Sequence, residues 1–264
     1  MDILIYGTVN SIVFALIAVG FSLVYGVSRI PNFAHGSVYV LVGFLTWSFI
    51  NDLKLNYALA VLISLMIASI IGLIIYRFIL IRLRGLPTSE IIASFAVSLI
   101  ILEGLRMQGI AGFKGFIGPF YVLQPFIDGK ISIFGVFVDY QRLVIIAGGV
   151  VILVFLWVFT HHTKTGLSLR AIAQDEQAAM MLGVNSDRTA MISLAIGSAL
   201  AGLAAVLILP LGNIAAEQGY RVLVYALAVC IIGGLGSWAG TILASFVLGF
   251  SMITSTALFG ALWE

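Results

Sequence analysis

The segment QDEQAAMMLG, residues 174–183, is a short polar stretch between two long apolar runs. A chain that only had to reverse its direction in a membrane would need a few turn residues here. Instead, residues 160–188 form a long connector that carries Lys164, Arg170 and Arg188, and basic connectors of membrane proteins face the cytoplasm. The paired alanines would let another protein approach a helix closely, and Gly183 supplies the C-terminal stop that such a helix needs. The segment therefore predicts a cytoplasmic helix that docks a partner protein, and a helical surface loop without a partner is the alternative.

The composition on either side of this connector is that of a membrane protein. Of the 264 residues, 62% are hydrophobic and 9% are charged, and the mean hydropathy is +1.18. Soluble domains carry about 25% charged residues, and a membrane-spanning helix needs about 20 apolar residues. We therefore expect one all-α polytopic membrane domain over residues 1–264 with about eight transmembrane helices. The expected spans are Ile3–Val27, Ser37–Ile50, Tyr57–Phe78, Ile91–Met107, Gln141–Thr160, Thr189–Leu209, Val222–Ile232 and Ala239–Leu258.

Two basic clusters set the expected orientation of these spans. Arg77–Arg84 and Lys164–Arg188 should both face the cytoplasm, which makes residues 161–188 a cytoplasmic loop. The stretch between them, residues 108–140, is rich in glycine and proline and is predicted to be an extracytoplasmic loop. The net charge of +2 gives no indication of a nucleic-acid partner, so the lipid bilayer is the expected environment.

Two of the expected spans are unusually short. Ser37–Ile50 follows a polar kink at residues 29–36, and Val222–Ile232 runs into a glycine-rich turn at residues 233–237. Short or glycine-interrupted apolar segments in corresponding positions of two halves are typical of transporters with an inverted repeat. The pattern favours such a repeat, and chance similarity between the two segments is the alternative.

Residues at these two interruptions are candidates for a translocation pathway, because backbone that leaves helical geometry at membrane depth must be buried in protein or line a watery cavity. The candidates are Asn32, His35, Gly233, Gly234 and Gly236. For the two polar side chains the sequence leaves two alternatives: they line the pathway, or they only fix the kink.

Other polar residues near the spans have simpler explanations. Glu103 lies within a span, where an ionisable residue is by default a functional candidate, but Arg106 follows it on the same helical face. A local ion pair is therefore the favoured interpretation. His161 and His162 are adjacent and lack metal-ligand spacing, so a solvated helix end is expected. Glu217, in an outer connector, is expected to be solvated.

Several motifs, taken together, resemble one family. Residues 17–27 (IAVGFSLVYGV) with residues 31–36 (PNFAHG) resemble the N-terminal signature of LivH-type permeases, which are membrane subunits of ABC importers for branched-chain amino acids and related small solutes. Residues 166–185 resemble the cytoplasmic loop of that family, and residues 232–237 (IGGLGS) with Gly240 resemble its C-terminal glycine motif.

The resemblance implies that Gln177, Ala178, Ala179 and Gly183 form the loop that couples the permease to its ATPase. The wider ABC importer motif has glutamate where this chain has Gln177, so a charge-assisted contact at that position is not expected. The family also continues with another apolar helix beyond the last span seen here, which implies that this chain is truncated or lacks that helix.

The resemblance further implies a set of partners in the bacterial cytoplasmic membrane. These are a second, related permease in a heterodimer, two ATP-binding subunits and a periplasmic solute-binding protein. The chain has no Gly-x-x-x-x-Gly-Lys-Ser/Thr loop, so it is expected to bind no cofactor and to leave ATP hydrolysis to its partners. It also lacks a catalytic constellation, so an enzyme is not expected.

Two other functions remain open at this point. Related permeases handle urea or short amides, and the sequence does not decide the solute. A secondary transporter with a broken-helix binding site is the second alternative. It would need ion-coupling groups in the membrane, of which Glu103 is the main candidate.

Overall fold

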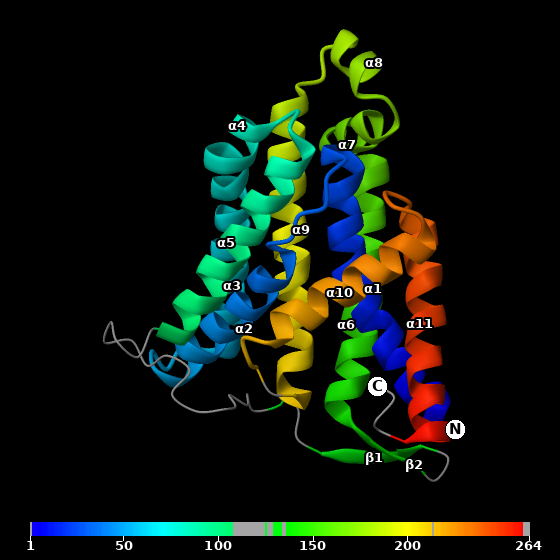
Figure 1. Ribbon diagram of the computed structural model, residues 1–264. Helices are drawn as coiled ribbons and strands as arrows, with labels where there is room; N and C mark the ends of the chain where they lie inside the picture. Colours follow the sequence, from blue (N-terminus) through cyan, green and yellow to red (C-terminus); the bar gives the residue numbers. More distant parts are fainter. Residues whose placement is uncertain (1, 108–124, 126–128, 134–135, 213, 261–264) are drawn as a thin grey trace.

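Long helices run side by side through the molecule in the computed structural model, which describes residues 2–107, 125, 129–133, 136–212 and 214–260 (Figure 1). The helices are α1 (Asp2–Ser28), α2 (His35–Asn51), α3 (Tyr57–Ile75), α4 (Ile81–Leu83), α5 (Pro87–Met107), α6 (Tyr140–His162), α7 (Lys164–Gln174), α8 (Glu176–Met181), α9 (Ser186–Ile208), α10 (Gln218–Gly233) and α11 (Trp238–Phe259). A π-helical turn, η1 (Tyr76–Leu80), joins α3 to α4, and a 3₁₀ turn, η2 (Leu209–Leu211), follows α9.

All eight predicted spans are helices, which confirms an all-α polytopic membrane protein. Within the described residues, six helical segments are long and apolar enough to cross a membrane, while α2 and α10 have only 17 and 16 residues. The boundaries differ most in three places, one of which is the start of α5 at Pro87, before the predicted start at Ile91. The third span continues through η1 into α4 and ends at Leu83, and α10 begins at Gln218, before the predicted start at Val222.

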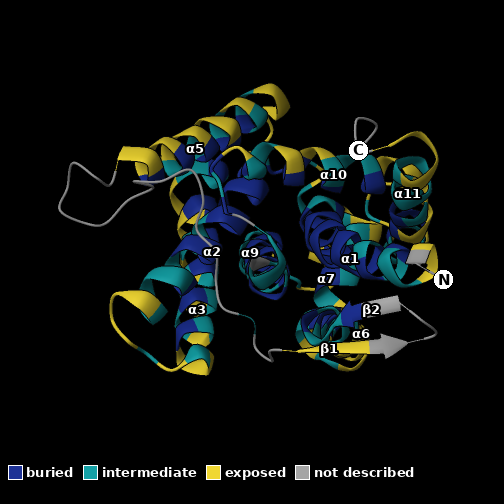
Figure 2. Cartoon of the chain, turned by 90° about the horizontal axis from the view of Figure 1, so that it is seen from below, coloured by how far each residue is buried: buried dark blue, intermediate teal, exposed yellow. Residues whose placement is uncertain are grey.

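Helices α1 and α9 form the centre of the bundle. Within the most apolar 18-residue stretch of each long span, 89% of the residues of α1 and 61% of those of α9 are buried. In the other four long spans the buried share is 28% or less. A helix that is apolar on all sides is typical of such a central position. Helix α1 packs against α6, α9, α10 and α11, and Figure 2 shows it as one of the most fully buried helices. The outer helices expose large apolar side chains, among them Leu62, Phe155 and Leu243.

The two ends of the bundle differ in structure. The predicted basic connectors lie at the same end, where α4, α7 and α8 meet, and the N-terminus lies at the other (Figure 1). The side of the membrane that each end faces stays a prediction.

The described part of the predicted extracytoplasmic loop lies at the end that holds the N-terminus (Figure 1). Residues 108–124, 126–128 and 134–135 of the loop lie outside the described residues. The remainder forms a hairpin that was not predicted, in which β1 (Lys130–Ile133) pairs antiparallel with β2 (Val136–Asp139). The register places Lys130 opposite Asp139, and the Nζ and Oδ1 atoms of this pair lie 3.7 Å apart.

Candidate transport and coupling sites

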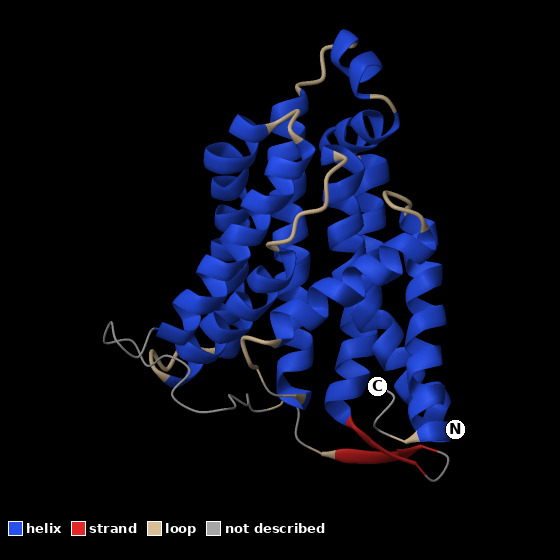
Figure 3. Cartoon of the chain, in the orientation of Figure 1, coloured by secondary structure: helices blue, strands red, loops and turns tan. Residues whose placement is uncertain are grey.

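The chain leaves helical geometry between α1 and α2 and runs along the bundle as an irregular segment, residues 29–34 (Figure 3). Its backbone groups are satisfied largely by nearby side chains. The Phe33 amide donates to Ser94 Oγ at 3.2 Å, the Ala34 amide donates to Asn32 Oδ1 at 3.1 Å, and Ser28 Oγ donates to the Ile30 carbonyl at 3.0 Å. Protein groups therefore replace the missing helical hydrogen bonds, and this is what allows the backbone to be irregular inside the bundle.

Asn32 and His35 lie where this break leads into α2, and both are buried. The Asn32 carbonyl accepts a hydrogen bond from the His35 amide at 3.3 Å. The His35 ring has its Nε2 atom 3.0 Å from the Ile17 carbonyl oxygen and meets the Phe21 ring edge-on, with centroids 5.7 Å apart. In this conformation both residues hold the break between α1 and α2. A place for them on a translocation pathway stays a prediction.

The two short helices cross each other at a pair of glycines. A methyl group on Gly36, at the start of α2, would overlap the carbonyl oxygen of Gly219, at the start of α10. A Cβ atom on Gly219 would lie 3.2 Å from the Gly36 carbonyl oxygen. Glycine thus allows backbone-to-backbone contact, as in close helix crossings of other membrane proteins. The sequence analysis missed Gly219, and its position at the start of a short apolar helix was the available signal.

The predicted C-terminal glycine motif forms the tight turn between α10 and α11. A Cβ atom on Gly233 would overlap the backbone of Gly240, and Gly234 and Gly236 have φ angles of +86° and +83°. The backbone of Gly236 also lies against Gly26 of α1. The motif therefore fixes the bend and its contact with α1, and its role in a pathway stays a prediction.

Helix α8 is the short helix predicted in the cytoplasmic loop. Asp175 caps its start, because the Asp175 Oδ1 atom accepts from the Ala178 amide at 3.0 Å. At its end Gly183 has a φ of +87°, its amide donates to the Met180 carbonyl at 2.9 Å, and the Val184 amide donates to the Ala179 carbonyl at 3.1 Å. This pair of bonds is a Schellman motif, so the predicted stop at Gly183 is confirmed.

The orientation of α8 differs from what the sequence analysis assumed. Ala179 is only 3% exposed and packs in one cluster with Leu169 and Ile172 of α7, so its small side chain brings α8 close to the bundle. Ala179 is thus not available to a partner protein in this conformation. Between Glu176 and Gly183, the exposed residues are Gln177, Ala178, Met180, Met181, Leu182 and Gly183.

A polar network that the sequence analysis did not predict holds the start of α8 in place. The Arg84 guanidinium forms ion pairs with Glu176 of α8 and Asp187 of α9. Its Nη2 atom donates to Ser186 Oγ at 2.6 Å, and the Tyr76 hydroxyl donates to Asp187 Oδ1 at 3.1 Å. Burial alone would lower the pKa of Arg84, but Tyr76, Glu176 and Asp187 together hold it above its ordinary value.

A second ion network lies at the opposite end of α5. Arg106 Nη1 is 2.8 Å from Glu103 Oε1, which confirms the predicted local pair. Arg106 Nη2 is also 2.5 Å from Glu217 Oε1, so Glu217 has a partner that the sequence analysis did not foresee. Among the described residues, no group of three histidine, cysteine or acidic side chains could hold a metal ion.

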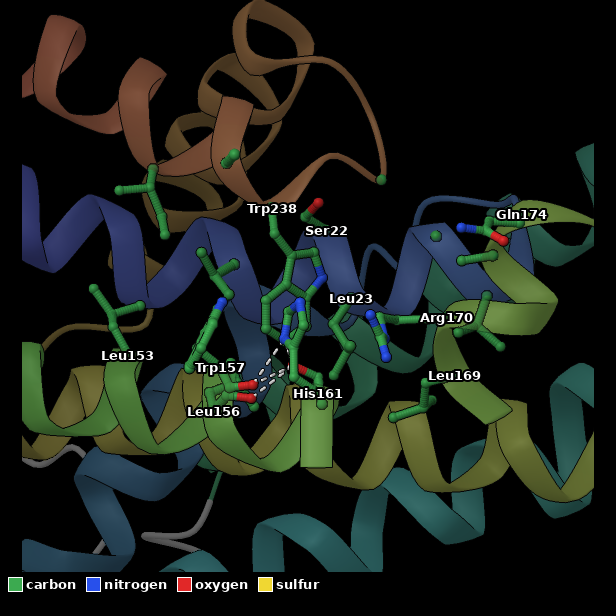
Figure 4. A pocket seen from close by; sticks show the side chains of 18 residues that line it. Ser22, Leu23, Leu153, Leu156, Trp157, His161, Leu169, Arg170, Gln174 and Trp238 are labelled. Carbon is green, nitrogen blue, oxygen red and sulfur yellow. Dashed lines mark hydrogen bonds between the residues drawn. The ribbon is translucent and has the colours of Figure 1, made fainter. Parts of the chain in front are cut away.

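A cavity of about 500 Å³ opens between α1, α6, α7 and the start of α11 (Figure 4). Its lining includes Ser22, Trp157, Arg170 and Trp238. His161 also lines it, and its ring stacks on Trp157 with centroids 4.8 Å apart. The end of α6 at His161, which was expected to be solvated, therefore forms part of the cavity wall.

A helical bundle with six segments long enough to cross a membrane, two short helices and a structured connector at one end is that of a multi-pass membrane protein. The chain belongs to the family described as "Branched-chain amino acid transport system / permease component", which it matches over residues 3–263. The family resemblance inferred from the sequence is therefore confirmed.

Three relatives illustrate the similarity. The chain is 27% identical to the high-affinity branched-chain amino acid transport system permease protein BraD of Pseudomonas aeruginosa, over 97% of this chain and 86% of the relative. It is 27% identical to the corresponding permease protein LivH of Salmonella typhimurium, over 92% and 82%. It is 26% identical to a probable branched-chain amino acid transport permease protein LivH of Methanocaldococcus jannaschii, over 89% and 75%. No solved structure matches the chain.

Proposed function

We propose that this chain is the permease subunit of an ABC importer that moves branched-chain or related small amino acids across the cytoplasmic membrane. Separate ATPase subunits bind and hydrolyse ATP, and this chain itself is not an enzyme. A second, related permease completes the channel as a heterodimer, and a periplasmic solute-binding protein delivers the solute. Membership of the permease family and the names of the relatives support this assignment over a secondary transporter.

The exposed tip of α8 is the observation that carries the coupling part of the proposal. Met181 is 90% exposed and Leu182 is 85% exposed, although both are large apolar residues. They project at the end of the bundle where the basic connectors lie, beyond the helices long enough to span the membrane (Figure 1). Exposed apolar side chains grouped in this way indicate a protein contact. The docking surface comprises Gln177, Ala178, Met181, Leu182 and the turn at Gly183.

The rest of the loop makes α8 suitable as a rigid lever. Asp175 caps its start, Gly183 closes its end, and Arg84 fastens Glu176 to α9. A force on the exposed tip would therefore be transmitted to α4 and α9 instead of bending the loop. In our proposal, closure of the ATPase pair pushes α8, and access to the pathway changes at the breaks around Asn32–His35 and Gly233–Gly236.

The docking contact can be tested with the double substitution Met181→Asp, Leu182→Asp. Full burial of each side chain would contribute about 1.5–3 kcal/mol to association. We therefore expect the variant to bind the cognate ATPase at least about tenfold more weakly. ATP-driven uptake of labelled leucine into reconstituted vesicles should fall in parallel, while the yield of the inserted permease should not change.

Leu53→Asp is the matched control, because Leu53 is also a large exposed apolar residue but lies in the connector between α2 and α3. That variant should bind the ATPase and transport like the wild type. Wild-type binding by the α8 variant would show that α8 is not the docking element. Competition of uptake by valine and isoleucine supports the proposed solute class, and competition by urea or acetamide alone would contradict it.

A further inference from the structure

The cavity between α1, α6, α7 and the start of α11, which we call the α6–α7 cavity, borders the proposed pathway, because Gly236 lies in its wall. Its volume of about 500 Å³ is typical of a site for a small organic molecule. Residues of the α7 helix line it, so it lies near the end of the bundle that carries α8 (Figures 1 and 4).

Most of the cavity wall is apolar, and five polar or charged side chains interrupt it: Ser22, Thr160, His161, Arg170 and Gln174. Leucines from three helices form much of the wall, among them Leu23, Leu156 and Leu169. Ser22 is fully buried, and its hydroxyl has no hydrogen-bond partner within the described part of the chain. The Arg170 Nε atom is likewise buried without a partner among the described residues. Buried polar groups in native proteins are nearly always satisfied, so two such groups in residues of one cavity wall are unusual.

The charges of the wall restrict the ligand to an anion. Arg170 extends from α7 toward Leu23 of α1 (Figure 4), and its planar guanidinium binds phosphate or carboxylate oxygens with two parallel hydrogen bonds. None of the lining residues is aspartate or glutamate. A zwitterionic amino acid would therefore find a positive charge for its carboxylate but no negative charge for its ammonium group. The cavity fits an anionic head group attached to an apolar body.

The surroundings favour a phospholipid as the source of this anion. Tryptophan is enriched where a membrane meets water, and Trp157 and Trp238 both line the cavity. The outer face of α6 next to Trp157 exposes large apolar side chains, including Val151, Val154 and Phe155, against which an acyl chain can lie. Basic pockets between membrane-spanning helices commonly hold anionic lipid head groups.

We propose that the α6–α7 cavity binds the head group of one anionic phospholipid, with its phosphate on Arg170 and Ser22 and its acyl chains along α6. The lipid would occupy a place distinct from the docking surface on α8 and next to Gly236 of the proposed pathway. The site makes the position of α7, which leads directly into α8, sensitive to the lipid that surrounds the protein.

The test measures lipid retained by the purified full-length chain, by native mass spectrometry after equilibration with phosphatidylglycerol or phosphatidylcholine. We expect one tightly held phosphatidylglycerol per chain and no comparable phosphatidylcholine. Arg170→Gln should weaken retention at least about tenfold, because a charge-assisted hydrogen bond is lost. Arg188→Gln is the matched control, since Arg188 is an exposed arginine of the same loop outside the cavity, and it should retain the lipid.

A second variant keeps the test decisive if Arg170→Gln folds poorly. Ala239 lines the cavity from an exposed position at the start of α11, so Ala239→Phe should fill the space without removing the charge, and it should also lose the lipid. Equal retention of phosphatidylglycerol in the wild type, Arg170→Gln and Ala239→Phe would overturn the proposal. Displacement of the lipid by millimolar inorganic phosphate would overturn it as well, because the site would then recognise a free anion. A cross-link from Ala239→Cys to a second permease chain would identify a subunit interface instead and would also overturn it.

Discussion

The crossing of α2 and α10 predicts a graded effect of adding a single methyl group at three glycines. At Gly36 the added Cβ atom would overlap the Gly219 carbonyl, which belongs to the backbone and cannot move by a rotamer change. At Gly219 the new Cβ atom would have neighbours at 3.2–3.3 Å, two of which are movable side-chain methyl groups of Val40 and Leu102. At Gly104 of α5 it would meet nothing within 4 Å.

The magnitudes follow from two opposing effects. Overpacking of a tight contact costs about 1–3 kcal/mol, while alanine in place of glycine inside a helix contributes up to about 1 kcal/mol. Gly36→Ala should therefore destabilise the protein by about 2 kcal/mol, and Gly219→Ala should be close to neutral by the same reasoning. Gly104→Ala should stabilise it by about 0.5–1 kcal/mol, because only the helix-propensity effect applies there.

Thermal unfolding of the three purified variants in one detergent measures this order. For a chain of this length, a change of 1 kcal/mol shifts the unfolding temperature by roughly 2–4 °C. Gly36→Ala should thus unfold about 4–8 °C below the wild type, and Gly104→Ala slightly above it. Equal unfolding temperatures for Gly36→Ala and Gly104→Ala would refute the close crossing of the two short helices.

Two further predictions concern the loop end of the bundle. In a double-mutant cycle of Arg84→Gln and Glu176→Gln, thermal unfolding should reveal a coupling energy of about 0.5–1 kcal/mol, because the pair is partly exposed; strictly additive effects would exclude the ion pair. For the orientation, a cysteine introduced at Thr165 should stay unlabelled by an impermeant thiol reagent in intact cells, while one at Lys130 in the hairpin should react. The reverse labelling pattern would place α8 outside the cell and remove the ATPase-docking argument.

The class of protein and the approximate positions of its helices could be predicted from the sequence alone. Hydropathy is a local property of the chain, so eight apolar segments were visible without any tertiary information. Charge is equally local, and the arginines of the two basic connectors correctly indicated that these connectors share one end of the bundle. Caps are local as well, which is why the short helix ending at Gly183 was predictable from its alanine pair and glycine.

Only the tertiary structure decided which residues and helices contact one another. Arg84 and Glu176 are separated by 92 residues, and Gly36 meets Gly219 across most of the chain. No local pattern reports such contacts, because they depend on how the spans pack around α1 and α9. The alanine pair shows the same division: the sequence placed it on a helix, but only packing against α7 turned Ala179 inward and left Met181 exposed. Period and composition fix which residues form a helix, whereas the direction each face points is set by the neighbours that the fold supplies.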